Sequence, residues 1–473
     1  MFRAIGVLLI GFAGVSAGAG ELHVGAATAS ITPDMPVALN GQMHTRIARE
    51  TASEAIAAAL AIESRDATAP EQAIIVTCDL AMISEGIIEK VRGRIKGRIA
   101  DFDAMKLVVN ATHTHTAPVT EEGIYEIPTE GVMQPAAYIE FLADRVADAA
   151  VNAWQSRKPA SAGWGLGHAI VAQNRRSVYA DGRAVMYGPT DAPDFRGIEG
   201  YEDHGVEVLF FWDANNELLA TAVNVACPAQ EVEGDSRIDA DFWHTVREAL
   251  RAKYGKDLVV LGWIGAAGDQ SPHLMYSKRA EERMRELRGL TRLEEIARRL
   301  LHAWEEAHDG AKKERHANLP MMHKVETIAL PLRVITEAEY ESAKAKVTEL
   351  SKDPNNKRVV MWHQDVVTRY ERQIAGTAKP YPMELHAIRL GDIAIATNDF
   401  ELYTEFGVQM KARSRALQTF VIQLAGPGTY VPTERASKGG GYSAIAESNV
   451  VGFEGGQVLT EQTVALVNSL FGE

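Results

Sequence analysis

Cysteine is scarce in this sequence, as are long apolar runs and positive charge. Only Cys78 and Cys227 occur among 473 residues. Export would allow one disulfide between them, but Cys78 lies in an apolar, strand-like run, which favours a buried free thiol. The net charge is −14, with 49 Lys and Arg against 63 Asp and Glu. This balance argues against a nucleic-acid groove, because phosphate binding requires clustered positive charge.

The first twenty residues contain the most continuous apolar stretch. Residues 4–15 are almost entirely apolar after a start that carries Arg3, and residues 16–20 are small or polar. This pattern predicts a signal peptide over residues 1–19, cleaved near Ala17 or Ala19, rather than a buried first helix. The stretch is too short to cross a bilayer comfortably, and no later segment is apolar for long enough. We therefore expect a soluble mature protein that is exported to the periplasm or the exterior.

Strand and helix patterns alternate along the rest of the chain. Continuous apolar runs at 73–82 and 258–264 suit strands that are covered on both faces. Helical periodicity is clear at 85–99 and 135–157. The Ala-rich stretch 55–62 has good helix propensity, although a strand is also compatible with it. The order predicts an α/β fold with a layered mixed sheet and flanking helices.

The alternation of strands and helices continues without a domain boundary, apart from one charged region. No internal repeat, low-complexity linker or domain boundary is visible, so residues 21–473 form one large domain in our interpretation. Residues 277–375 differ, because Arg and Glu are dense there and leucines recur at helical spacing. We predict a helical insertion near 277–375 whose charges form solvated faces and not a membrane-binding surface.

The stretch from Val108 to Pro118 carries the most specific chemical signal. It begins as the end of an apolar strand and then places His113 and His115 two residues apart. Alternate residues of an extended chain point to the same side, so both rings can reach one cavity. Neutral imidazole binds metals and accepts protons near neutral pH. The structural alternative is a pair of surface histidines on a turn.

Similar loops with polar residues follow or precede other apolar strands, and a sheet whose strand ends meet at one edge would gather them. Four motifs, in this order, resemble those of the neutral (non-lysosomal) ceramidases and their bacterial relatives. They are Asn-Ala-Thr-His-Thr-His at 110–115, Gly-Asp-Gln-Ser-Pro at 268–272, Glu401 with Thr-Glu-Phe-Gly at 404–407, and Tyr430 with Tyr442. The resemblance covers the amidase domain of the family, from about Val24 to the end of the chain.

The resemblance implies a zinc-dependent hydrolase that cleaves the amide bond of an N-acyl substrate, either ceramide-like or smaller. The zinc ligands that it implies are His113, Glu401 and Tyr430. The groups that it implies to act on water or substrate are His115 as a catalytic histidine, Tyr442, Arg175 (or Arg176), and Ser271, which matches a serine regarded as a nucleophile.

These residue types suit the implied chemistry. A catalytic zinc takes about three protein ligands and a water, whose pKa it lowers to roughly 7. His115 could accept a proton from that water and return it to the leaving amine. A tyrosine hydroxyl and a guanidinium could stabilise the oxyanion. Structural alternatives exist: Glu401 at a helix N-terminus, packed tyrosines, an ion pair of Arg175, or Ser271 as a helix cap.

The sequence departs from the family pattern in two places. After an Asn-x-Ala-x strand end the pattern expects a metal-binding histidine, but here residues 224–227 are followed by Pro228. The ligand is then Cys227 itself, Gln230, a nearby side chain such as Asp241, or is lost. The second departure is the end of the chain soon after Tyr442, where the family has a further β-rich domain. We therefore expect weaker recognition of long-chain lipids.

Two other functions stay open on these grounds. One is a serine-type amidase or esterase that uses Ser271 with His115 or His273. The other is a non-catalytic relative that binds a ligand or glycan in a degenerate cleft. The sequence defines neither the substrate nor the oligomeric state.

Overall fold

A computed structural model describes residues 19–66 and 70–472 of the chain. The predicted signal peptide lies outside these residues except for Ala19, which begins the first strand. None of the helices in the described part of the chain combines the length and the apolar character that crossing a bilayer requires.

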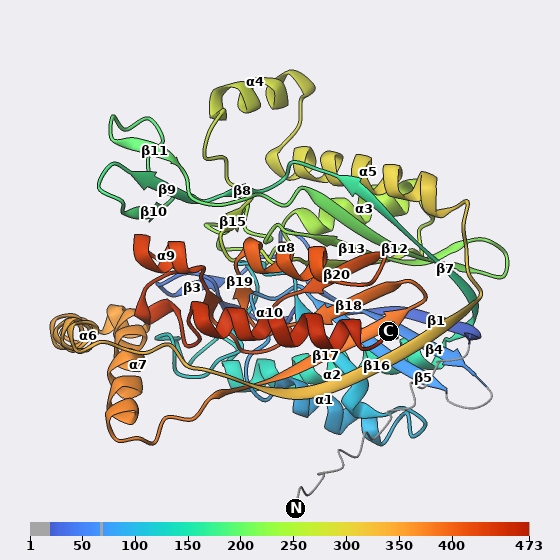
Figure 1. The fold of residues 1–473 in the computed structure, drawn as a ribbon, viewed down its shortest axis with the longest axis horizontal. Helices are drawn as coiled ribbons and strands as arrows, with labels where there is room; N and C mark the ends of the chain where they lie inside the picture. The colour runs from blue at the N-terminus through green and yellow to red at the C-terminus, as the bar shows by residue number, and fades with distance from the viewer. Residues whose placement is uncertain (1–18, 67–69, 473) are drawn as a thin grey trace, which may run out of the picture.

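The described residues form a twelve-stranded mixed sheet flanked by helices, which confirms the predicted fold class (Figure 1). The strands fall into three groups of four with one recurring order. Three strands, each antiparallel to the next, are followed by a helix, a fourth strand parallel to the third, and a second helix. The first strands of the groups join them, because β1 pairs with both β7 and β16.

The bounds of these elements are as follows. The first group contains β1 (Ala19–Ser30), β4 (Ile56–Arg65), β5 (Glu71–Cys78), α1 (Ile87–Lys96), β6 (Leu107–Ala111) and α2 (Pro135–Gln155). The second contains β7 (Lys158–His168), β12 (Gly205–Asp213), β13 (Leu218–Val225), α3 (Phe242–Tyr254), β14 (Val259–Ile264) and α5 (Arg292–Ala311). The third contains β16 (Asn318–Leu330), β17 (Tyr381–Leu390), β18 (Ile393–Thr397), α8 (Thr404–Arg413), β20 (Gln418–Ile422) and α10 (Phe453–Asn468).

Shorter elements connect the groups and surround the site. They are β2 (Val37–Leu39), β3 (Arg46–Ala48), β8 (Gln173–Asn174), β9 (Arg176–Tyr179), β10 (Ala184–Met186), β11 (Phe195–Ile198), β15 (Gln270–Ser271), α4 (Lys278–Arg288), α6 (Glu337–Leu350), α7 (Lys357–Ile374), β19 (Glu401–Leu402), β21 (Tyr430–Val431) and α9 (Glu434–Gly439). Three single turns of 3-10 helix complete the description: Ala104–Lys106, Pro354–Asn356 and Ala446–Ser448.

The prediction of no internal repeat is therefore wrong at the level of topology. The three groups share an order of elements and the apolar character of their strands, but no motif that repeats along the sequence. Burial requires side chains of suitable polarity and volume without specifying which ones, so a repeated architecture can persist without a repeated sequence.

The inner faces of the three strand groups meet in one apolar core. Leu60 of β4, Phe211 of β12 and Ile395 of β18 are all fully buried in it. Three outer cores lie between each strand group and its own helices. Strands covered on both faces need apolar side chains on both, which explains the continuous apolar runs in the sequence.

The Ala-rich stretch 55–62 forms most of β4 and not a helix. Its alanines are fully buried, and α2 packs across them on one face. Pairing with β1 and β5 satisfies the backbone of β4 on both edges. Small side chains let the helix approach this strand closely, so tertiary packing overrides the helix propensity of alanine.

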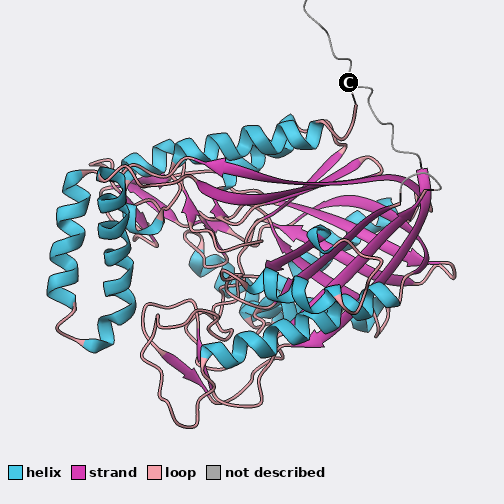
Figure 2. Ribbon diagram, turned by 90° about the horizontal axis from the view of Figure 1, so that it is seen from below, coloured by secondary structure: helices cyan, strands magenta, loops and turns pink. Residues whose placement is uncertain are grey.

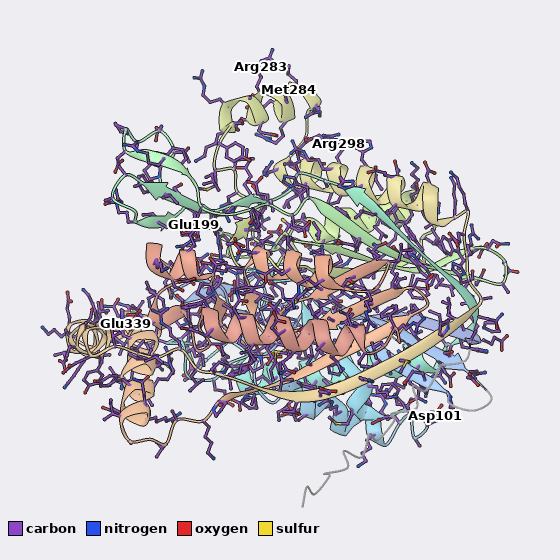
Figure 3. All side chains as sticks on the ribbon, in the orientation of Figure 1. Asp101, Glu199, Arg283, Met284, Arg298 and Glu339 are labelled. Carbon is purple, nitrogen blue, oxygen red and sulfur yellow. The ribbon has the colours of Figure 1, made fainter. Side chains whose placement is uncertain are left out.

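The predicted helical insertion at 277–375 is wrong as a single unit. β16 lies within it and is a strand of the main sheet that begins at Asn318. The charged stretch before β16 forms two helices, because Gly289, with a φ of 66°, ends α4. Only α6 and α7 form an inserted hairpin, which stands apart from the body at the left of Figures 1 and 2. The helix α4 has no buried residue, and Figure 3 shows its Arg283 and Met284 at the outer edge of the molecule.

Candidate active site

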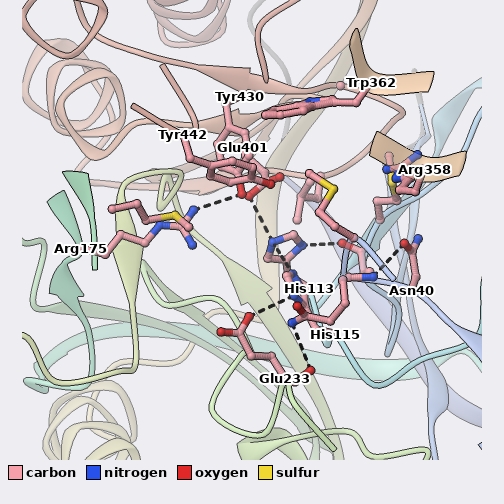
Figure 4. A pocket seen from close by; sticks show the side chains of 18 of the residues that line it. Asn40, His113, His115, Arg175, Glu233, Arg358, Trp362, Glu401, Tyr430 and Tyr442 are labelled. Carbon is pink, nitrogen blue, oxygen red and sulfur yellow. Dashed lines mark hydrogen bonds and ion pairs between the residues drawn. The ribbon is translucent and has the colours of Figure 1, made fainter. Parts of the chain in front are cut away.

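Loops from the carboxyl ends of the parallel strand pairs line one cavity of about 560 Å³. His113 and His115 follow β6, Glu401 follows β18, and Tyr430 follows β20. The loop after β13 adds Glu233. Carboxyl ends of strands are where α/β sheets bind ligands, because loops there vary without disturbing the core. The convergence expected from the sequence is therefore present (Figure 4).

His113 presents Nε2 to the cavity. Its Nδ1 donates to the carbonyl oxygen of Ala81 at 2.5 Å, which places the lone pair of the neutral ring at Nε2. Nε2 lies 3.1 Å from Oε2 of Glu401 and 3.2 Å from Nε2 of His115. The backbone φ of His113 is 65°, in the left-handed region that non-glycine residues rarely adopt. Strain of this kind often accompanies functional residues.

His115 is held from both of its nitrogens. Nδ1 lies 3.3 Å from Oε2 of Glu233, and Nε2 lies 2.7 Å from the amide nitrogen of Gln230. The amide oxygen of Gln230 accepts from Nη1 of Arg175 at 3.3 Å, so its NH2 group must face the imidazole. His115 therefore accepts at Nε2 and carries its proton at Nδ1. Burial lowers the pKa of His115, although Glu233 opposes this, and the ring is neutral near pH 7.

Glu401 completes a set of acceptor atoms that face one another. Burial alone would raise the pKa of Glu401, but His113 and Arg175 outweigh burial, and the carboxyl is ionised. At 3.1 Å, the carboxylate oxygen of Glu401 and Nε2 of His113 need a cation between them, either a proton on the ring or a metal ion. Imidazole nitrogen and carboxylate oxygen are common zinc ligands. The pair His113 and Glu401 therefore fits a metal ion.

The third ligand is less conventional. Within the described residues, no group of three or more His, Cys, Asp or Glu side chains is arranged to hold a metal ion. The hydroxyl of Tyr430 is the remaining candidate beside Glu401, because β19 and β21 pair Glu401 with Tyr430. The donor set is thus one imidazole, one carboxylate and one phenol, with Nε2 of His115 adjacent.

Arg175 lines the cavity beside Tyr430. Its Nη2 donates to the hydroxyl of Tyr430 at 3.1 Å and to the carbonyl oxygen of Gly268 at 3.0 Å. The side chain is buried, its Nε has no partner, and it makes no ion pair with any described residue. The nearby Glu401 carboxylate interacts with this cation electrostatically without a direct ion pair, so N–H groups of Arg175 stay available to a negative charge that forms in the cavity.

Two tyrosines complete this end of the cavity. The rings of Tyr430 and Tyr442 are 5.7 Å apart. Burial raises the pKa of both hydroxyls, and the charge of Glu401 raises them further, so both remain protonated donors. Arg176, the alternative to Arg175, pairs instead with Glu199 at 2.5 Å and donates to the carbonyl oxygen of Tyr442 at 2.9 Å. Its place is structural, in the support of the Tyr442 loop.

The Gly268–Pro272 motif supports the site from behind. A Cβ at position 268 would lie 2.3 Å from the carbonyl oxygen of Glu401, so only glycine allows this approach. The carboxylate of Asp269 accepts from the backbone N–H of Thr404 at 2.9 Å and from the amide of Asn174 at 2.8 Å. Asp269 thereby ties the segment that carries Arg175 to the helix that follows Glu401.

Ser271 lies behind the residues that line the cavity and is not one of them. It is fully buried, and its hydroxyl accepts hydrogen bonds from the Tyr187 hydroxyl at 2.9 Å and from the backbone N–H of His273 at 3.1 Å. Tyr187 lines the cavity, so Ser271 positions it. The expected helix cap is wrong, because α4 begins at Lys278 and its N-cap residue is Ser277.

Cys227 is not brought to the site. Its sulfur lies 3.6 Å from the carbonyl oxygen of Val171, in the core of the second strand group. Burial raises the pKa of the Cys227 thiol well above its ordinary value, which disfavours the thiolate that binds zinc. Asp241 is not a replacement, since it caps α3 by accepting from the backbone N–H of Phe242 at 2.7 Å. Only Gln230, of the substitutes considered, reaches the catalytic histidine.

Among the cavity residues that the sequence analysis did not single out are Glu233, Arg358 and Trp362. Glu233 had no sequence signal beyond its place in an acidic loop. Arg358 and Trp362 are four residues apart on α7, a spacing that puts both on one helix face. That spacing is a usable signal, but nothing in the sequence shows that this face covers the cavity.

Comparisons with known proteins bear on the fold. No protein-family model matches the sequence, and no curated protein matches it significantly. The structure is similar to the crystal structure of neutral ceramidase from Pseudomonas aeruginosa, with a TM-score of 0.68 and 16% identity over 95% of this chain and 74% of that chain. It is also similar to a ceramidase complexed with C2, with a TM-score of 0.66 and 16% identity over 96% and 75% of the two chains. The fold is therefore ceramidase-like.

Proposed function

We propose that this protein hydrolyses the amide bond of an N-acyl substrate with the help of zinc held by His113, Glu401 and Tyr430. The observation that carries the proposal is the approach of Nε2 of His113 to Oε2 of Glu401 at 3.1 Å inside the cavity, a distance at which one cation can be shared by the two atoms. The ceramidase-like fold and the order of the four motifs support the same reading.

The zinc ion, when bound, would supply Lewis acidity and lower the pKa of a water molecule to roughly 7. The protein contributes a proton carrier in His115. Its Nε2 can accept a proton from the attacking water and deliver it to the leaving nitrogen. Glu233 beside Nδ1 stabilises the protonated ring and fixes its orientation, as carboxylates do in other histidine pairs. For this proton transfer to occur, the hydrogen bond from the Gln230 amide to Nε2 of His115 must break.

Arg175 and the Tyr442 hydroxyl would stabilise the oxyanion that forms on the scissile carbonyl. Arg175 is a buried cation that forms no direct ion pair with a described carboxylate, and Tyr442 is a protonated donor. Donors that are fixed before the reaction need no reorganisation when charge develops. Loss of one such donor typically lowers kcat by about 10²–10³-fold.

The cavity favours a small or medium-sized N-acyl substrate. Its volume of about 560 Å³ lies in the range of small-molecule sites. Met43, Met82 and Met186 also line the cavity, and their adaptable apolar side chains suit an acyl chain. The composition of residues 1–19 supports the further proposal that the protein acts after export.

Turnover of a panel of N-acyl substrates by three variants tests this proposal. His113→Ala should lower kcat/KM by more than about 100-fold, because it removes a metal ligand. Ser271→Ala should retain most of the activity, since Ser271 lies outside the cavity. The control His44→Ala changes an exposed histidine and should leave the rate unchanged. Loss of activity in Ser271→Ala with retention in His113→Ala would instead support the serine route.

One observation favours a second candidate, ligand binding without catalysis. The position expected to supply another metal ligand is Pro228, and its possible substitute Cys227 faces the core and not the cavity. This candidate predicts that wild-type protein binds N-acyl compounds but turns none of them over, with or without added zinc.

A further inference from the structure

The cavity contains two guanidinium groups in different surroundings. Arg175 is buried beside Tyr430, next to the atoms proposed to react. Arg358 comes from the inserted hairpin and lines the same cavity. Figure 4 shows the two on opposite sides of Glu401 and His113. One cation is therefore next to the scissile bond, and the other faces a different part of any bound substrate.

The N–H groups of Arg358 are available to a ligand. Its closest carboxylate, Glu121, lies 3.8 Å away, which is too far for a hydrogen bond. Its guanidinium is 6.0 Å from the ring centre of Tyr125, and no described residue accepts a hydrogen bond from it. The preceding residue, Lys357, pairs with Glu126 at 2.8 Å on the surface and does not line the cavity. The two neighbouring cations thus have different roles.

An aromatic row connects Arg358 with the reacting centre. Trp362, one helical turn after Arg358, lies 5.8 Å from Tyr442, and Tyr442 lies 5.7 Å from Tyr430 (ring centres). A substrate whose carbonyl is near Arg175 can lie along this apolar row. Its remote end then meets the unbonded donors of Arg358.

We propose that the preferred substrates are N-acyl compounds with an ionised carboxylate remote from the scissile carbonyl, and that Arg358 binds this carboxylate. The inference rests on the proposed function. A guanidinium matches a carboxylate with two parallel hydrogen bonds, which a neutral lipid cannot accept. The carboxylate can belong to the amine portion, as in an N-acyl amino acid, or to the acyl portion, as in the half-amide of a dicarboxylic acid.

Two matched substrate pairs test the proposal and distinguish these sources. One pair is an N-acyl amino acid and its uncharged carboxamide; the other is a dicarboxylic half-amide and the equivalent with a terminal methyl group. In one of the pairs, wild-type kcat/KM should favour the acid by about 10- to 100-fold. Arg358→Gln should lower kcat/KM for that acid far more than for its neutral partner. Arg358→Lys should restore part of the preference, because the charge remains but the fork is lost.

The matched control is Lys357→Gln, which removes an equal charge one residue away and should keep the wild-type preference. Equal rates for the acid and neutral members of both pairs in wild type would overturn the inference and leave the hydrolase proposal intact. An equal loss for both members in Arg358→Gln would also overturn it.

Absence of all turnover would instead count against the proposed function, and calorimetric titration with the same compounds then decides the inference. Binding of the acid that weakens by about 10- to 100-fold in Arg358→Gln supports it. Failure of the wild-type protein to bind either acid more tightly than its neutral partner contradicts it.

Discussion

Gln230 is the residue that joins the two groups required by the proposed chemistry. It is almost fully buried, and its one amide donates to His115 and accepts from Arg175. Because an amide has a donor end and an acceptor end, this arrangement determines which nitrogen of His115 is the acceptor. A residue outside any recognisable motif thus controls the protonation pattern of a residue within one.

Asp399, two residues before Glu401, gives a prediction for stability against pH. Burial raises its pKa to about 7, and its carboxyl accepts from the hydroxyl of Tyr381 at 3.0 Å. The folded state therefore holds this proton more tightly than the unfolded chain, in which an aspartate has a pKa of about 3.9. The resulting stabilisation is complete below about pH 4 and is lost as the pH rises through about 7.

The variant Asp399→Asn should remove this dependence. Between pH 5 and 8, the free energy of unfolding of the wild type should fall by about 2 kcal/mol more than that of the variant. Urea unfolding at the two pH values measures this difference. The control Asp34→Asn, at an exposed carboxylate, should follow the wild type. Parallel pH profiles for wild type and Asp399→Asn would show that Asp399 is ionised throughout.

At the scale of elements, the backbone of α5 packs directly on the backbone of β7, where β7 has Gly165 and Gly167. A Cβ on Gly167 would lie 2.0 Å from the carbonyl oxygen of Ala303, and one on Gly165 would lie 2.5 Å from that of Ala307. These are backbone atoms of a helix and cannot move independently. Gly167→Ala should therefore lower the free energy of unfolding by about 1–3 kcal/mol, because the helix must shift.

Gly93→Ala is the matched comparison for this substitution. Gly93 lies inside α1, and a Cβ there has nothing within 4 Å. Replacing a helix-interior glycine by alanine should stabilise the protein by about 0.5–1 kcal/mol. Denaturant unfolding of both variants should give changes of opposite sign. The same sign in both would contradict the close approach of α5 to β7.

Sequence patterns predicted elements well where burial was uniform and poorly where it was not. β5 and β14 are covered on both faces, and their apolar runs identified them. β16 was largely missed because one of its faces is polar: residues such as Lys324 and Glu326 are not buried, and they lie in a chain region dominated by charged helices. β4 was ambiguous because alanine fits both a helix and a closely packed strand.

The candidate site shows the same division. His113, His115, Glu401, Tyr430, Tyr442 and Arg175 were all named from motifs, and the structure places all six around one cavity. Glu233 and Arg358 could not be named, because they reach the cavity through a loop conformation and through the packing of an inserted hairpin. Motifs record residues whose spacing is local, whereas these two depend on the tertiary arrangement alone.

At the scale of the whole molecule, the site lies where the three strand groups meet. The first group supplies His113 and His115, the second supplies Gln230 and Glu233, and the third supplies Glu401 and Tyr430. No group contains a complete set of acceptors, so the proposed metal site exists only when all three are assembled. A bound ion would join the first and third groups through His113 and Glu401.

The central claim is tested most directly by amide hydrolysis with protein freed of metal by a chelator, measured as zinc is returned. The account predicts that activity is lost on metal removal and returns in wild type at about one zinc per chain. It also predicts that His113→Ala protein does not recover at any zinc concentration that suffices for wild type. A rate of hydrolysis that is the same before chelation, after chelation and after zinc addition would contradict the account.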